Sequence, residues 1–248
     1  MAESLEISWK RISIEGATIV VSILLAFAID AWWDERVERQ QLIGHLELIR
    51  AELVENLTVA ETAQKNMYGQ ILSSNRVLSA LGDSEKDLSG SEFSADLMDT
   101  FGLGDIGDKR HNSINALVNS DGFGSIRSPG LIVALNQTIS TIDEIERILE
   151  RQSNIYFSHI MPMLEQHALS VTNGYLTNDF YGAWNDELIL VTPESPFPVD
   201  QHGLRSDQVW NAILNWKMEL VEYRTSWGLY IRDARILIEE IDAEIENN

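Results

Sequence analysis

The stretch ISIEGATIVVSILLAFAIDAWW, residues 12–33, decides how the rest of the chain is organised. Its central part, residues 16–29, carries no charged side chain. A helix over the whole stretch is roughly 33 Å long, which matches the hydrocarbon thickness of a bilayer. Glu15 and Asp30 fall near its two ends, where partial hydration lowers the cost of a charge. The stretch therefore predicts a transmembrane helix.

Aromatic and basic residues flank this stretch. Tryptophans stand where indole rings form a belt at a membrane surface, at Trp9, Trp32 and Trp33. Positive charges nearly balance on the two sides, with Lys10 and Arg11 before the stretch and Arg36 and Arg39 after it. We expect residues 1–11 to form a short cytoplasmic segment and residues 34–248 to lie outside the membrane. In a bacterium this is a single-pass inner-membrane protein with a periplasmic body.

A cleaved signal peptide is an alternative interpretation of the same residues. Lys10 and Arg11 precede the apolar run, and Ala26-Phe27-Ala28 fits a small-x-small cleavage site. The acidic side chains upstream argue against it, because they cancel the positive charge of the leading region. The protein is then either anchored or secreted as a helical protein after cleavage, and a core helix of a soluble protein is a third interpretation.

One side of the predicted span is polar. Small, hydroxyl and acidic residues recur there at steps of three or four: Glu15, Thr18, Ser22, Ala26 and Asp30. Such residues allow two helices to approach closely and to hydrogen-bond in lipid. We interpret this side as a packing site for another transmembrane helix, from a second copy or a larger membrane complex. The alternative is that the two acidic residues merely lie at the interfaces.

The residues beyond the span have the periodicity of long amphipathic helices. Apolar side chains recur at steps of three and four at Leu42, Leu46, Ile49, Leu53, Ala60, Ala63, Met67, Val77 and Leu81. A helix from Asp34 to Leu81 is roughly 70 Å long and cannot bury this stripe alone. The chain must fold back on it or oligomerise.

The later segments complete the predicted bundle. Residues 82–108 contain a turn-rich connection with a short helix over 95–100, and another short helix is expected at 112–119. Ser128-Pro129 predicts a helix start, and Pro162 predicts a kink or an end. A helix of about 40 residues follows Ser206, with unbroken coiled-coil-like steps of four and three at Val209, Ile213, Trp216, Leu220, Tyr223, Trp227, Tyr230, Ala234, Leu237 and Ile241. We predict an all-α antiparallel bundle whose core is shared by the first, the Ser128 and the last helices.

Residues 170–205 form an irregular insertion in this pattern. The insertion holds three of the five prolines, and residues 187–192 have the composition of a short strand. Its aromatic residues are the candidate partner surface outside the membrane: Tyr175, Phe180, Tyr181, Trp184 and Phe197. The alternative interpretation is that these aromatic side chains cover the far end of the bundle and bind no partner. A lid over a ligand site is a further alternative.

Composition and motifs exclude several classes of chemistry. The net charge of −21 argues against binding of nucleic acid, and the lack of cysteine excludes disulfides and thiolate sites. Residues 102–107 match G-x-G-x-x-G, but no strand–helix alternation surrounds the match. Neither H-E-x-x-H nor Glu-x-x-His occurs, and His159 and His167 have no companions at ligand spacing. We therefore expect no metal, no cofactor and no enzymatic activity.

The N-terminal third carries a recognisable sequence pattern. Gly16 opens the apolar run, which ends in a flank containing Trp32, Trp33, Glu35 and Arg36, and a Leu-x-x-Glu-Leu-x-x-Asn-like pattern follows at Ile49, Glu52, Leu53 and Asn56. This pattern resembles a group of uncharacterised single-pass bacterial membrane proteins. A weaker echo lies at residues 117–122, and Asp30 departs from the group, in which an uncharged polar residue is expected. The resemblance implies an N-terminal anchor in a bacterial envelope protein.

These observations favour a protein that acts by binding. The expected function is that of a membrane-anchored accessory or scaffold protein, which contacts its partners through the span and the helical bundle. A periplasmic ligand-sensing or ligand-binding domain is the alternative. Membrane lipid and another transmembrane helix are the expected partners.

Overall fold

The fold is described by a computed structural model, which covers residues 9–101, 111–166 and 200–247. Helix α1, Trp9–Gly82, has 74 residues, and at the usual rise it is about 110 Å long. The predicted continuation of the span into a long amphipathic helix is therefore confirmed. Gly44 and Gly69 lie inside α1 with no atom within 4 Å of where a Cβ would stand. A glycine costs a helix only about 1 kcal/mol, and α1 continues through both.

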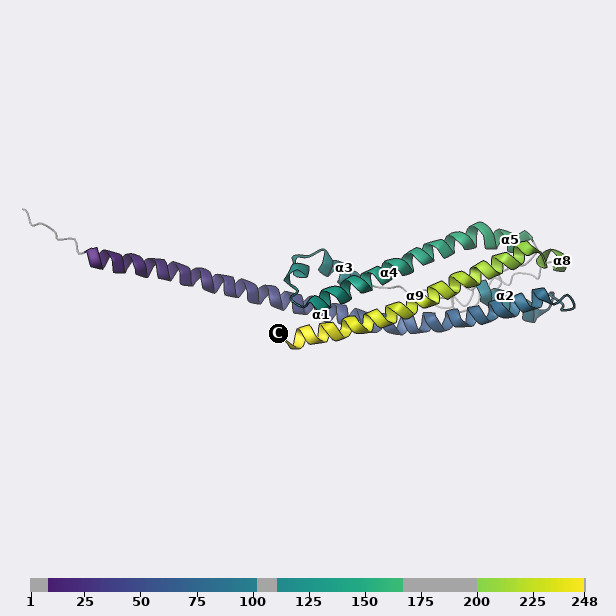
Figure 1. Ribbon diagram of the computed structural model, residues 1–248, viewed down its shortest axis with the longest axis horizontal. Coiled ribbons are helices and arrows are strands. Elements are labelled where there is room, and N and C mark those ends of the chain that lie inside the picture. Colours follow the sequence, from purple (N-terminus) through teal and green to yellow (C-terminus); the bar gives the residue numbers. More distant parts are fainter. Residues whose placement is uncertain (1–8, 102–110, 167–199, 248) are drawn as a thin grey trace, which may run out of the picture.

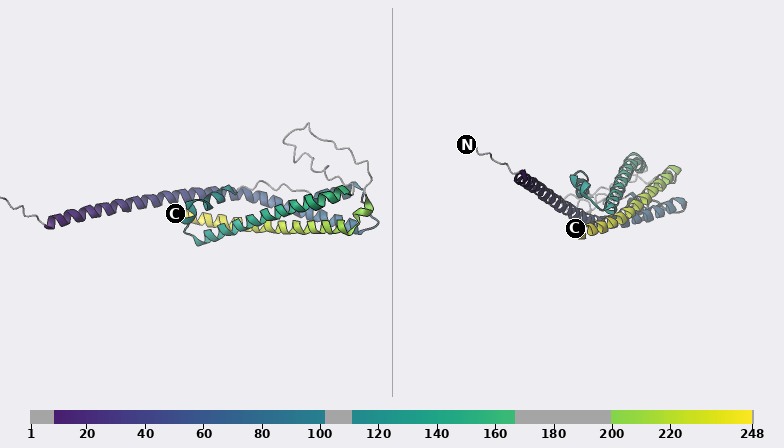
Figure 2. Two further views of the ribbon diagram at one scale, coloured as in Figure 1. Left: turned by 90° about the horizontal axis from the view of Figure 1, so that it is seen from above. Right: turned by 60° about the vertical axis from the view of Figure 1, so that its left-hand side comes forward.

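Three long helices form the bundle. Helix α9, Asp207–Glu246, packs beside the part of α1 that follows the apolar stretch, and helix α4, Pro129–Ile155, packs against α9. Figure 1 and the right view of Figure 2 show the bundle part of α1 and α4 both leading away from the apolar end of α1, while α9 runs back between them. The described residues contain no β-strand, so the fold is all-α over that part of the chain. The antiparallel bundle predicted from the sequence is confirmed.

Two clusters of buried side chains follow one another along the bundle. The cluster nearer the span joins α1, α4, α9 and α3, Asn112–Val118, around Trp227. The distant cluster joins the end of α1 to α2, Ser91–Phe101, and to the start of α9 around Trp216. All ten predicted core positions of α9 are at most 2% exposed. All nine of α1 are buried as well, because steps of three and four keep them on one side of the helix.

Serine side chains cap the starts of α4 and α9. The Ser128 Oγ accepts a hydrogen bond of 3.2 Å from the Leu131 N–H, and Pro129 occupies the first helical position of α4. The Ser206 Oγ accepts a bond of 3.4 Å from the Val209 N–H at the start of α9. Each cap contributes about 1 kcal/mol by satisfying an amide at the open end of a helix. Both predicted helix starts are confirmed.

The sequence predicted a kink or an end at Pro162, and the regular α-helix is interrupted just before this residue. Helix α4 passes into a π-helical turn, η2, Tyr156–Ile160, and then into α5, Met161–Gln166. A proline ring clashes with the carbonyl four residues earlier, which here belongs to Ser158 inside η2. A π turn at this place moves that carbonyl away, so the chain stays helical past the proline.

The short helices are held by polar contacts as well as by apolar packing. The Glu52 carboxylate of α1 accepts hydrogen bonds from the Asn112 and Ser113 N–H groups, at 3.0 and 2.9 Å, and so caps the first turn of α3. At the far end, the Trp216 Nε1–H donates to the Thr100 carbonyl at 2.7 Å and attaches α2 to α9. The predicted short helices at 95–100 and 112–119 correspond to α2 and α3.

The remaining elements are short connections. Turn η1, Asp121–Ser125, joins α3 to α4, and α8, Gln201–Leu204, precedes α9 inside the predicted irregular insertion. The G-x-G-x-x-G match at 102–107 and the suggested strand at 187–192 lie outside the described residues.

Candidate functional site

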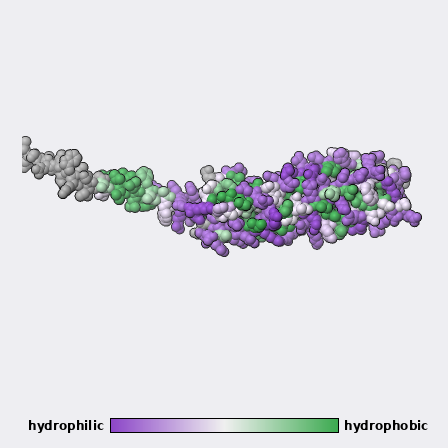
Figure 3. Space-filling view, in the orientation of Figure 1, coloured by the Kyte–Doolittle hydropathy of each residue, from purple (hydrophilic) through white to green (hydrophobic). Residues whose placement is uncertain are grey.

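The apolar part of α1 beyond the bundle is the most conspicuous surface of the protein. Every described side chain from Ala17 to Trp33 is exposed, and the large aliphatic ones and Phe27 are 50–66% exposed. Figure 3 shows this part as a hydrophobic band that ends where the hydrophilic body begins. By length and composition it is a candidate membrane span or signal sequence. A continuous apolar surface of this kind is not left in water by soluble monomers.

The predicted polar side of this helix is an exposed surface, and no other helix among the described residues packs against it. Thr18, Ser22, Ala26 and Asp30 follow one another at steps of four, over about a third of the circumference. The Ser22 hydroxyl donates to the Thr18 carbonyl at 2.8 Å, which satisfies it within its own helix, as hydrocarbon requires. Asp30 forms no ion pair with the residues that the structure describes. The side chain of Glu15 lies outside the described residues.

The body of the protein begins within a few residues of the span. Arg127, just before α4, pairs with Glu35 of α1, and Arg39 of α1 lies 3.9 Å from Glu244 near the end of α9. Figure 1 accordingly shows the C-terminus of the chain beside α1 at this level. If the span is in a membrane, this end of the bundle therefore lies next to the lipid headgroups.

A second apolar surface lies on the side of α9 that faces away from the core. We call it the outer α9 face. It contains six partly exposed apolar residues, 37–60% exposed: Trp210, Leu214, Met218, Val221, Leu229 and Ile236. With Thr225 and Arg232 they follow steps of four, four and three, which is the spacing of a helix-packing stripe. Tyr68 of α1 borders this face and contacts Arg224, 5.1 Å from its ring centre.

A groove of about 560 Å³ lies at the far end of the bundle. It runs between the π turn with α5 on one side and the first turns of α9 on the other. The lining contains no Asp, Glu, Lys or Arg side chain. Its polar members are Ser158, His159, Gln166, Gln208, Asn211 and Asn215. Four carboxamides supply both donors and acceptors, and aliphatic side chains form the floor. Such a lining suits a neutral, hydrogen-bonding ligand.

The titratable groups in the core serve the packing of the bundle. Burial raises the pKa of Tyr230 to about 12, although a hydrogen bond with Asn56 opposes the shift. Burial also raises the pKa of Tyr223. His111 lies edge-on to Tyr230 with ring centres 5.9 Å apart. Among the described residues no group of three or more His, Asp or Glu side chains is placed to hold a metal ion.

The sequence interpretation placed two candidate sites, and the structure describes only one of them. Four of the five span residues share one side of α1. The aromatic partner surface, formed by Tyr175, Phe180, Tyr181, Trp184 and Phe197, lies outside the described residues. The outer α9 face was missed, although its four-four-three spacing is visible in the sequence, because the stronger core stripe of the same helix dominates the pattern. The groove was missed because its two walls are about 50 residues apart in sequence.

Comparisons with known proteins add no family. Neither the protein-family models nor the curated proteins nor the solved structures gave a match to this chain.

Proposed function

We propose that this protein is a membrane-anchored accessory or scaffold protein that works by binding other proteins. One observation carries the proposal: the apolar part of α1 is exposed on every side and continues, without a break, into the core of the bundle. Lipid or another protein must cover such a surface. The described part of the chain does not fold back to cover it.

The polar side of the span is the proposed seat of another transmembrane helix. Ala26 leaves room for close approach of a second backbone, and Asp30 offers a carboxylate at the end of the span. In a bilayer, packing of small residues and hydrogen bonds across helices drive association. The partner is therefore a helix with small residues and a hydrogen-bond donor on the facing side.

The outer α9 face extends the proposed contact beyond the membrane. Because α1 connects the span to the bundle without a break, a partner that is held at the span can also contact the body. The apolar side chains of the outer α9 face, such as Met218 and Leu229, are a second proposed contact surface, for a part of the partner that lies outside the membrane.

Purification of the full-length chain from its native membranes in a mild detergent tests the proposal. We expect a complex larger than a monomer, containing either a second copy or another membrane protein. A purely monomeric chain with no co-purifying protein contradicts the proposal. Intact mass of the purified chain shows at the same time whether cleavage after Ala28 has removed the span.

Matched substitutions separate a docking role of the span from simple anchoring. Ala26→Trp places a bulky ring on the polar side and should release the partner while membrane fractionation stays unchanged. Leu24→Trp places the same ring on the opposite side of the helix and should leave the complex intact. The Glu15→Leu/Asp30→Leu variant removes both acidic groups and should insert normally but lose the complex. If all three variants retain the partner, the span is only an anchor.

The place of the body is a separate part of the proposal. We propose that residues 34–248 lie in the periplasm of a bacterial cell and that residues 1–11 remain in the cytoplasm. Protease added to intact spheroplasts should then digest the body. Protection of the body from that protease contradicts this orientation.

A ligand-binding function is the second candidate, and the groove beside η2 favours it. A π turn is a local departure from the α-helix that is frequent at functional sites, and this one forms a wall of the groove. Stabilisation of the full-length chain by neutral polyols, saccharides or short peptides in a thermal-shift screen supports this function. If a ligand stabilises the Asn211→Leu variant as much as the unaltered chain, the ligand binds outside this groove.

A further inference from the structure

The membrane-proximal end of α1 carries a notch with an excess of positive charge. The notch has a volume of about 420 Å³ and is lined by Trp32, Glu35, Arg36, Arg39, Gln40 and Ile43. It lies just outside the predicted span, between the last indoles and the level at which α9 ends. If the span is in a membrane, the notch therefore faces the region of the lipid headgroups.

The face of the helix at the notch separates basic from acidic residues. Trp32, Arg36, Arg39 and Ile43 follow steps of four, three and four, so they share one side of α1. Asp34 lies two residues after Trp32, which is the opposite side of a helix. Glu35 is therefore the acidic residue of α1 that lies on the same side as the arginines of the notch.

The two acidic groups that reach the notch are already paired. Glu35 pairs with Arg127. Glu244 lies 3.9 Å from Arg39, at the long limit of an ion pair. Arg36 forms no ion pair with the described residues, and its guanidinium carbon stands 5.7 Å from the Trp32 ring centre. Three arginines thus face two carboxylates, and the notch keeps one uncompensated positive charge.

The position of the notch along the helix matches the headgroup layer of a bilayer. Arg36 lies three residues beyond Trp33, about 4.5 Å along the axis, and Arg39 lies about 9 Å beyond it. The polar layer on each side of the hydrocarbon is about 5–8 Å thick. Interfacial indoles mark the hydrocarbon boundary, so Arg36 stands within the polar layer. Arg39 begins just beyond it, and its long side chain, which leans toward the N-terminus of the helix, can reach the level of the lipid phosphates.

We propose that this notch binds the phosphate of an anionic phospholipid. The planar guanidinium groups of Arg36 and Arg39 donate to the phosphate oxygens, and such charge-assisted bonds are the strong ones. Gln40 offers a further donor, and the Trp32 indole packs beside the glycerol backbone. An anionic headgroup is preferred to a zwitterionic one because the notch holds one unpaired cation. This inference rests on the proposed membrane anchorage.

Lipid retention by the purified full-length chain tests the proposal. The chain is solubilised in mild detergent that contains equal amounts of phosphatidylglycerol and phosphatidylcholine. Native mass spectrometry then counts the lipids that remain bound. We expect preferential retention of phosphatidylglycerol. In the Arg36→Gln/Arg39→Gln variant, the ratio of bound phosphatidylglycerol to bound phosphatidylcholine should fall about 25-fold. This is about five-fold for each arginine, which corresponds to about 1 kcal/mol each.

A matched control carries the same change of charge elsewhere. Arg147→Gln/Arg235→Gln removes two exposed arginines of the body, on α4 and α9, and should keep the preference of the unaltered chain. Equal retention of the two lipids overturns the proposal, and so does an equal loss in both double variants. If glycerol phosphate displaces the lipid at comparable concentration, the notch is a site for soluble phosphate, and the lipid assignment is wrong.

The same experiment distinguishes this inference from the proposed function. A chain that fractionates with membranes but shows no lipid preference retains its anchor and loses only the headgroup site. A chain that is recovered without its span, or that never fractionates with membranes, contradicts the anchorage itself.

Discussion

Thr141 on α4 and Asp233 on α9 are joined by a buried hydrogen bond, in which the Thr141 Oγ1 donates to the Asp233 Oδ2 at 2.8 Å. Asp233 is only 2% exposed. Its other oxygen accepts from the Arg232 Nε–H at 2.8 Å. Burial of an ionised carboxylate is tolerated only where each oxygen is hydrogen-bonded. The pair therefore fixes the register of α4 against α9 at the centre of the bundle.

Replacement of Thr141 by valine should destabilise the bundle. Valine keeps the shape but removes the donor, and the Asp233 carboxylate then lacks one of its bonds in a buried place. We expect a loss of about 1–3 kcal/mol in the free energy of unfolding, measured by denaturant titration of the full-length chain in mild detergent. Thr225→Val is the control, because its exposed hydroxyl bonds only to the Val221 carbonyl of its own helix. Equal losses in the two variants would show that the buried contact is unimportant.

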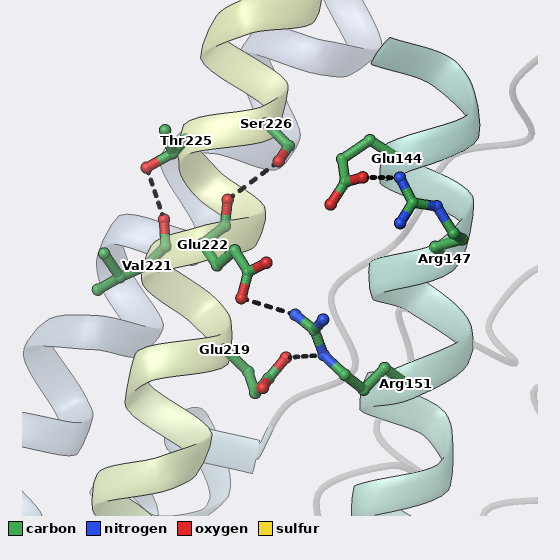
Figure 4. A network of polar contacts seen from close by, with 8 residues as sticks. All are labelled: Glu144, Arg147, Arg151, Glu219, Val221, Glu222, Thr225 and Ser226. Atoms are coloured by element: carbon green, nitrogen blue, oxygen red, sulfur yellow. Dashed lines mark hydrogen bonds and ion pairs between the residues drawn. The ribbon is translucent and has the colours of Figure 1, made fainter. Parts of the chain in front are cut away.

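The ion pairs of Arg151 should contribute far less. Its Nε–H lies 2.8 Å from Glu219 and a terminal nitrogen lies 2.6 Å from Glu222, which together connect α4 to α9 (Figure 4). The arginine side chain is 44% exposed, so water screens both pairs. Arg151→Ala should cost about 0.5–1 kcal/mol, and added salt should reduce this cost.

The control for that prediction is Arg147→Ala. Arg147 pairs with Glu144 inside α4 and does not connect two helices. Its replacement should cost less than about 0.5 kcal/mol. A cost of several kcal/mol for Arg151→Ala would mean that the pair is shielded from solvent in a way that its exposure does not indicate.

Gly44→Ala should stabilise the protein. The glycine stands inside α1, and no atom lies within 4 Å of the position that a Cβ would take. Alanine is preferred to glycine in a helix interior by about 0.5–1 kcal/mol. The midpoint of denaturation should rise by the corresponding amount. Gly228→Ala is the comparison, because its Cβ would come within 3.0 Å of the Gln64 Nε2, and a smaller gain is expected. A lower free energy of unfolding for Gly44→Ala would contradict this prediction and would indicate a close contact at this level of the helix.

The buried tyrosines should make the bundle sensitive to alkali. Burial raises the pKa of Tyr230 from 10.0 to about 12, so folding favours the protonated phenol. The stability from this group is complete below pH 10 and is lost as the pH rises through the folded-state pKa of about 12. Unfolding should coincide with the growth of phenolate absorbance in a pH titration.

Two phenylalanine variants check this account. Tyr230→Phe should move the alkaline unfolding midpoint upward, because the group that ionises has gone. Tyr68→Phe removes a phenol that is half exposed on the surface and should leave the midpoint where it was. If both variants have the same midpoint as the unaltered chain, burial of Tyr230 does not control the alkaline transition.

The periodicity of the sequence predicted the bundle because side-chain burial in a helix follows the helix period directly. Ten positions on α9 and nine on α1 were placed in the core on this basis, and all are buried. The serine caps of α4 and α9 were also predictable, since a cap is a contact over three residues. At Pro162 the sequence predicted a kink or an end, but not the π turn η2 that interrupts the α-helix there, because a π turn departs from the helix period used for the prediction.

Contacts between helices were beyond the same reasoning. Asp233 has the composition of a solvated helix residue, and its burial depends on Thr141, which comes from another helix 92 residues away. Pairing of Arg39 with Glu244 likewise connects the two ends of the chain. In the candidate site, the polar side of the span could be predicted from spacing. The outer α9 face was hidden by the stronger core stripe of the same helix, and the charge balance of the notch depends on Arg127 and Glu244, which come from other parts of the chain.

The rigid connection between span and body can be measured directly. Leu24 lies in the apolar band and Leu48 in the bundle region, and both side chains are about 60% exposed. The chain has no cysteine, so Leu24→Cys/Leu48→Cys can be spin-labelled at these two sites alone. A continuous helix places the two backbone positions about 36 Å apart with a narrow distance distribution. Leu48→Cys/Leu72→Cys has the same sequence separation wholly within the bundle and provides the reference width. A much broader distribution for the first pair would show a hinge between the apolar part of α1 and the bundle, and would contradict a rigid connection between them.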